Sequence, residues 1–207
     1  ETLQAYTKKE SVLLVANHVS WLDIVVLNAH RPSRFIGKAE LARWPVVGRL
    51  IRDTGTLFIE RERRQDTHRV NRRAADALAA GDVVAVFPEG TTTDGTTVLR
   101  FHGSLLQPIV DAGGHVQPVA IRYHDGHGAL SLAPEYAGDT SFAASFWRVC
   151  GERRLAVELI ASSPLPALAR HRRELAREAE DAIRTALAGR GGATAPGTRG
   201  GPAAGPR

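Results

Sequence analysis

Cysteine, methionine and long apolar runs are scarce or absent in this 207-residue sequence. Its single cysteine, Cys150, excludes an internal disulfide framework and a four-cysteine zinc site. No apolar run approaches the roughly 18 residues of a membrane-spanning helix, and the start shows no signal-peptide pattern. Because the chain begins at Glu1 and contains no methionine, we expect a fragment or a processed form.

Acidic residues are also missing from the segment 189–207, which carries much of the net charge of +5. This segment holds three arginines, seven of the 20 glycines and three of the 11 prolines, so it cannot bury enough apolar surface to fold. The rest is nearly neutral and gives little support for nucleic-acid binding. We therefore expect one folded domain over 1–188, a disordered tail over 189–207, and no nucleic-acid partner.

Short runs rich in valine and isoleucine alternate with longer segments of helical period. The short runs predict strands at 12–16, 34–37, 56–59, 83–87, 116–121, 130–132 and 155–160. The longer segments predict helices at 20–29, 39–53, 65–80, 104–112, 141–149 and 165–188. This alternation predicts an α/β fold class, a single layered domain whose largely parallel central sheet is flanked by helices.

Polar side chains follow three of the predicted strands, where ligand sites of open α/β sheets lie. They are Asn17 and His18 after the first strand, Glu60 and Arg61 after the third, and Pro88, Glu89 and Gly90 after the fourth. Their position at three separate strand ends is the first sign of an enzyme.

The segment NHVSWLD, 17–23, allows two compatible interpretations. In the first, Ser20 and Asp23 form a capping box at the start of a helix. In the second, Asp23 accepts a hydrogen bond from the His18 ring and leaves the other ring nitrogen free as a general base. Since no G-x-S-x-G nucleophile motif is present, such a base would activate a substrate hydroxyl directly.

Two further segments suit anionic or hydroxyl groups. Arg61 ends the segment GTLFIER, 55–61, and its guanidinium matches a phosphate. The turn FPEGTTT, 87–93, combines the Glu89 carboxylate with backbone amides and hydroxyls. Neither a Walker loop nor a G-x-G-x-x-G motif after a strand is present, which disfavours a nucleotide-driven motor and a dehydrogenase.

Four segments together, in this order and spacing, resemble the glycerolipid acyltransferase family, which includes the 1-acyl-sn-glycerol-3-phosphate acyltransferases. The NH-x-S-x-x-D block is matched by Asn17, His18, Ser20 and Asp23. The G-x-x-F-I-x-R block is matched by Gly55, Phe58, Ile59 and Arg61. The F-P-E-G-T block is matched by Phe87, Pro88, Glu89, Gly90 and Thr91, and the V-x-P-V-x-I block by Val116, Pro118, Val119 and Ile121.

The resemblance implies that His18, oriented by Asp23, deprotonates the free sn-2 hydroxyl of 1-acylglycerol-3-phosphate. The alkoxide then attacks the thioester of acyl-CoA or of acyl carrier protein, giving phosphatidic acid for phospholipid biosynthesis. The resemblance assigns the substrate contacts to Arg61, Glu89, Gly90, Thr91, Gly55, Ser20 and Asn17. It implies no metal and no cofactor beyond the thioester co-substrate.

One departure from the family pattern leaves the acceptor open. Many members carry arginine directly after F-P-E-G-T, where this chain has Thr92. The segment FPEGTTTDG, 87–95, is similar to relatives that acylate lyso-ornithine lipid, and Arg100 is a candidate to replace the missing charge. A second alternative is a non-catalytic domain that binds acyl-CoA or a lysolipid, although the presence of both His18 and Asp23 favours an enzyme.

The implied partners are a lysolipid acceptor, an acyl thioester donor, acyl carrier protein as one form of that donor, and a membrane surface. We expect peripheral docking at the cytoplasmic face of the inner (plasma) membrane, through an exposed apolar patch and arginines. Trp21, Trp44 and Trp147 are candidates for interfacial or core positions. Of the remaining histidines, His102 is the one that we expect to line the substrate pocket.

Overall fold

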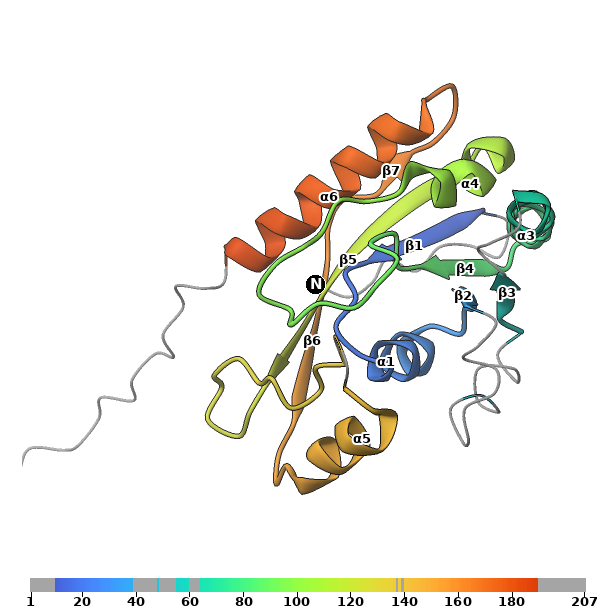
Figure 1. Cartoon of the computed structure of the whole chain (residues 1–207). Coiled ribbons are helices and arrows are strands. Elements are labelled where there is room, and N and C mark those ends of the chain that lie inside the picture. The colour runs from blue at the N-terminus through green and yellow to red at the C-terminus, as the bar shows by residue number, and fades with distance from the viewer. Residues whose placement is uncertain are drawn as a thin grey trace, which may run out of the picture.

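The computed structural model describes residues 10–38, 48, 55–59, 64–136, 138 and 140–189 (Figure 1). Its strands are β1 Val12–Ala16, β2 Arg34–Lys38, β3 Leu57–Ile59, β4 Val83–Val86, β5 His115–His124, β6 Ala156–Ala161 and β7 Leu165–Pro166. Its helices are α1 Leu22–His30, α3 Arg64–Ala79, α4 Gln107–Ala112, α5 Phe142–Gly151 and α6 Arg172–Ala188, with a 3-10 turn, η2, at Gly103–Leu106.

The strands form one sheet in the order β3-β2-β4-β1-β5-β6. The short strand β7 is not part of this order but also pairs with β5. β3, β2, β4, β1 and β5 are parallel to their neighbours in that order, whereas β6 and β7 run antiparallel to β5. The predicted α/β class with a largely parallel sheet is therefore confirmed. Parallel strands end at one edge of the sheet, so the residues that follow β1 and β4 emerge side by side.

Helices cover both faces of the sheet because its strands are apolar on both sides. Along β1, Leu13 and Val15 belong to one buried apolar layer, and Val12 and Leu14 belong to the other. The first layer is completed by α3, α4 and α6, and the second by α1 and α5. Figure 1 shows α4 and α6 on the side of the sheet away from α1 and α5.

Two predicted elements need correction. The segment 130–132 forms only an isolated bridge between Leu130 and His124 and is no strand of the sheet. The helix predicted at 165–188 begins only at Arg172, because Pro164 and Pro166 interrupt a helix and Leu165–Pro166 pairs with β5 instead. The helix predicted at 39–53, with Trp44, and the predicted tail lie outside the described residues, apart from Gly48 and Gly189.

Gly114 lies directly before β5, next to Ser11, which directly precedes β1. A Cβ atom at this position would be 2.1 Å from the backbone oxygen of Ser11, which also accepts a hydrogen bond from the His115 N–H at 2.9 Å. The side chain of any other residue would therefore push the starts of these two central strands apart.

We expect Gly114→Ala to lower the free energy of unfolding by about 1–3 kcal/mol, because the added methyl overpacks this strand contact. Chemical denaturation followed by circular dichroism measures the change. Gly151→Ala is the matched control, since a Cβ there meets nothing within 4 Å, and we expect it to shift stability only slightly. Equal stability of Gly114→Ala and the unsubstituted chain would contradict the expectation.

Candidate active site

His18 follows β1 at the carboxyl edge of the sheet, and the predicted contact with Asp23 is present. The His18 Nδ1 atom lies 2.8 Å from Asp23 Oδ2, and Asp23 has no exposed side-chain surface. A carboxylate at Nδ1 keeps the proton on that nitrogen, so in the neutral ring Nε2 carries the free lone pair. Among the described residues, none hydrogen-bonds to Nε2, and the ring is 17% exposed.

Asp23 also makes one of the two contacts of the capping box, since it accepts from the Ser20 N–H, whereas the Ser20 hydroxyl accepts from Leu22 and not from Asp23. Its Oδ2 atom accepts hydrogen bonds from the Val19 N–H at 2.8 Å and the Ser20 N–H at 2.9 Å, next to the start of α1. These backbone donors compensate a carboxylate that would otherwise be buried at high cost. One side chain thus holds the loop before α1 and orients His18.

Tyr123 is a site residue that the sequence analysis missed. Its hydroxyl, on β5, donates to Asp23 Oδ1 at 2.7 Å, and the ring is buried. Burial raises the pKa of the Tyr123 hydroxyl well above its ordinary value, and the Asp23 charge adds to that rise, so the hydroxyl stays a donor. Tyr123 lies two residues beyond the V-x-P-V-x-I block, so its place at the end of that strand was visible in the sequence, whereas its contact with Asp23 was not.

The turn after β4 holds His18 from three directions. The Phe87 ring stacks on the imidazole at a centroid distance of 4.0 Å and an interplanar angle of 11°. The His18 N–H donates to Glu89 Oε1 at 2.8 Å, and the His18 carbonyl accepts from the Thr93 N–H at 2.8 Å. Both the ring and the backbone of His18 are therefore held in place.

Glu89 joins two chain segments. While Oε1 accepts from His18, Oε2 accepts from the Leu99 N–H at 2.8 Å. Burial raises the pKa of the Glu89 carboxyl, and the hydrogen bonds from Leu99 and His18 oppose this rise. Gly90 has φ +75° in the same turn, a conformation that favours glycine, and Thr91 is exposed beside it.

Asn17 and Ser20, which were expected to contact substrate, are fully buried and bonded to backbone. The Asn17 amide donates to the Ile121 carbonyl at 3.0 Å and accepts from the Ile121 N–H at 2.7 Å, linking β1 to β5. The Ser20 hydroxyl oxygen accepts from the Leu22 N–H at 3.3 Å. Because neither residue has exposed surface, both support the site from behind and do not line it.

Gly55 is a second correction. It precedes β3 with φ +69° and packs against Arg34, which begins β2. Since β3 is parallel to β2, and β2 to β4, Gly55 lies at the amino edge of the sheet, opposite to His18. Its role is therefore that of a turn residue. Arg61, the expected phosphate ligand, lies outside the described residues, as does Glu60.

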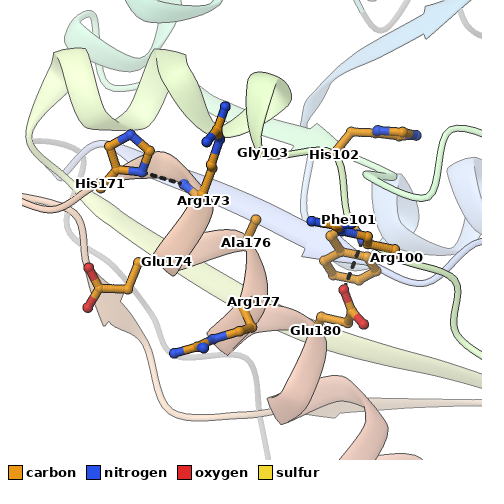
Figure 2. A pocket seen from close by; sticks show the side chains of 10 residues that line it. All are labelled: Arg100, Phe101, His102, Gly103, His171, Arg173, Glu174, Ala176, Arg177 and Glu180. Atoms are coloured by element: carbon orange, nitrogen blue, oxygen red, sulfur yellow. Dashed lines mark hydrogen bonds between the residues drawn. The ribbon is translucent and has the colours of Figure 1, made fainter.

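A groove of about 950 Å³ lies between the segment Arg100–Gly103 and α6 (Figure 2). His102 and Arg100 are among its lining residues. His18 does not line this groove. Phe101 and Ala176, which do line it, belong to the apolar layer of α3, α4 and α6.

Metal ligands do not gather in the part of the chain that the structure describes, where no three His, Cys, Asp or Glu side chains come together. His124 has its ring nitrogens near the Gly128 carbonyl and the Glu158 carboxylate.

Comparison with known proteins shows the family to which the sequence is similar. Residues 1–122 match the protein family described as Acyltransferase. A lyso-ornithine lipid O-acyltransferase from Pseudomonas aeruginosa is 41% identical over 181 residues, covering 87% of this chain and 69% of that protein. A 1-acyl-sn-glycerol-3-phosphate acyltransferase from Neisseria gonorrhoeae is 40% identical over 148 residues, covering 72% of this chain. The matched part spans 58% of the length of the Neisseria protein.

A solved structure resembles this fold. The crystal structure of the 1-acyl-sn-glycerophosphate acyltransferase PlsC from Thermotoga maritima superposes with a TM-score of 0.63. It is 24% identical in sequence, and the match covers 92% of this chain and 70% of that one. The likeness supports the single-domain α/β architecture.

We expect Tyr123→Phe to lower the free energy of unfolding by about 1–3 kcal/mol, because Asp23 Oδ1 loses its hydroxyl donor and one oxygen of a buried carboxylate is left unsatisfied. Chemical denaturation followed by circular dichroism measures the change. Tyr136→Phe is the control, because burial alone raises the pKa of its hydroxyl and Asp23 makes no contribution there. Equal stability of Tyr123→Phe and Tyr136→Phe would show that the hydroxyl of Tyr123 does not support the buried carboxylate.

Proposed function

This chain belongs to the Acyltransferase family, and from that premise we propose that it transfers an acyl group from a thioester donor to the hydroxyl of a lysolipid. The observation that carries the proposal is the His18 ring. Its Nδ1 atom is held by the buried Asp23, while its Nε2 atom has no partner among the described residues and lies at the carboxyl edge of the sheet.

In the proposed reaction, His18 Nε2 takes the proton of the acceptor hydroxyl as its oxygen attacks the carbonyl carbon of the thioester. The new C–O bond forms, and the tetrahedral intermediate collapses with cleavage of the C–S bond. The leaving thiolate then takes the proton back from His18. Asp23 stabilises the transient imidazolium, and the Tyr123 hydroxyl keeps the Asp23 carboxylate in position.

The acceptor that we propose is 1-acylglycerol-3-phosphate, with its free sn-2 hydroxyl, and the donor is acyl-CoA or acyl carrier protein. Lyso-ornithine lipid is the second candidate acceptor, and one observation favours it. At the position after Thr91 this chain has Thr92, whose hydroxyl donates to the Tyr136 carbonyl, so no cation is supplied there. The relatives from Pseudomonas and Neisseria carry the two corresponding names.

Because both lysolipid candidates are amphiphiles, we also propose that the chain acts at a membrane surface. The face that we propose is the cytoplasmic face of the inner (plasma) membrane. Within the described ranges, no helix combines the length and the apolar character needed to cross a bilayer.

His18→Ala should lower kcat for acyl transfer by about 10²–10⁴-fold, because the general base is lost while the fold stays intact. The assay uses purified protein, a lysolipid and an acyl thioester, and circular dichroism checks the fold. His127→Ala, an exposed histidine in the turn after β5, is the control and should keep full activity. Near-normal turnover in His18→Ala would defeat the proposal and favour a domain that only binds lipid or acyl-CoA.

Thr92→Arg should shift the preference toward the phosphate-bearing acceptor. One charge-assisted hydrogen bond to the phosphate corresponds to about a 10–100-fold gain in kcat/KM for lysophosphatidic acid relative to lyso-ornithine lipid. The two acceptors are offered side by side to both proteins. Thr97→Arg, which adds the same charge at an exposed position, is the control. An unchanged ratio in Thr92→Arg would mean that the acceptor head group does not approach this turn.

A further inference from the structure

Most exposed side chains of helix α5 are apolar, whereas the solvent-facing side of a helix is normally polar. Its ten residues, FAASFWRVCG, include one charged side chain, Arg148. Trp147 is 71% exposed and Phe146 is 38% exposed, and both lie on this helix. Large aromatic side chains that stay in contact with solvent mark an interaction surface.

The exposed rings continue a half-buried aromatic cluster. Phe146 contacts Trp147 at a centroid distance of 5.7 Å and Phe142 at 6.0 Å, and Phe142 contacts Trp21 at 5.3 Å. Trp21 and Phe142 pack against the apolar layer that α1 completes. We call Phe146 and Trp147 the α5 aromatic face. Phe142 and Trp21 connect this face to the apolar layer, so its two rings are held by packed neighbours.

Basic side chains follow this face along the chain. Arg148 is on α5, and Arg153 and Arg154 follow the helix, all three exposed, with Glu152 as the one acidic residue among them. Aromatic rings next to arginines suit the boundary between lipid headgroups and acyl chains, where anionic headgroups attract the cations.

The α5 aromatic face is joined to the catalytic loop. The Trp21 indole N–H donates to the Ser145 hydroxyl of α5 at 3.1 Å, and Trp21 comes three residues after His18. In Figure 1, α5 lies below α1, on the side of the molecule away from α6. A surface bound at α5 is therefore placed beside the loop that carries His18.

We propose that the α5 aromatic face, with Arg153 and Arg154, docks on an anionic lipid bilayer and presents the site to lysolipid in that bilayer. This inference rests on the proposed lysolipid acyl transfer and adds the surface by which the acceptor is reached. A second copy of this chain fits the face less well. In a two-fold dimer the arginines of one copy would meet those of the other, whereas anionic headgroups complement them.

Vesicle flotation tests the docking without relying on turnover. We expect the chain to float with vesicles of phosphatidylglycerol and phosphatidylcholine in equal parts. The double variant F146A/W147A should show about a tenfold lower partition coefficient, because two interfacial rings are lost. Leu168→Ala is the matched control, since Leu168 is 73% exposed outside α5, and it should bind like the unsubstituted chain.

Two further measurements identify the contact. Arg153→Ala with Arg154→Ala should weaken binding to the anionic vesicles by roughly fivefold for each charge, and should leave binding to pure phosphatidylcholine unchanged. Tryptophan emission should shift to the blue on vesicle binding, and this shift should shrink in Trp147→Phe, which keeps an apolar ring and therefore still binds.

Acyl transfer separates failure of the docking from failure of the proposed function. F146A/W147A should keep its activity on acceptor dispersed in detergent micelles and lose activity on acceptor embedded in vesicles. Equal flotation of F146A/W147A and the unsubstituted chain, or no flotation of either, would overturn the docking inference even where micellar acyl transfer is normal. Loss of a dimer in F146A/W147A without loss of flotation would assign the face to a second copy instead.

Discussion

The buried carboxylate of Asp23 is the constraint on which the site depends. A charge without exposed surface is tolerated only where hydrogen-bond donors replace water. Here the donors come from the His18 ring, from two backbone N–H groups of the loop before α1, and from the Tyr123 hydroxyl on β5. Any movement of α1 relative to β5 would leave an oxygen of this carboxylate unsatisfied. The interaction that orients the imidazole therefore also holds the helix in place.

A second set of polar side chains holds the backbone around the imidazole. Asn17 forms two hydrogen bonds with the backbone of Ile121, and Glu89 accepts from the N–H groups of His18 and Leu99. These contacts tie together the ends of β1 and β4, the middle of β5 and the loop that leads toward η2. In the proposed reaction, little rearrangement of the imidazole would then be needed.

The two sides of the molecule differ in a way that suits the proposed chemistry. Just before α6, Arg170 forms ion pairs with Glu174 and Glu178 of the helix, and its hydrogen bond lowers the pKa of Glu178, so these exposed charges are paired in water. On α5, apolar rings reach the solvent instead. A lipid acceptor approaching from the α5 side would meet the His18 loop without crossing the charged surface of α6.

Local patterns in the sequence were enough to predict the strand at Val12–Ala16, the layered α/β class and the pairing of His18 with Asp23, because each depends on residues close together along the chain. Tertiary structure alone decided which side chains meet across the sheet. The contact of Tyr123 with Asp23, the burial of Asn17 and the position of Gly55 at the opposite edge all follow from strand order and register. Pairing between distant strands is set by the packing of the whole core, which no short segment encodes.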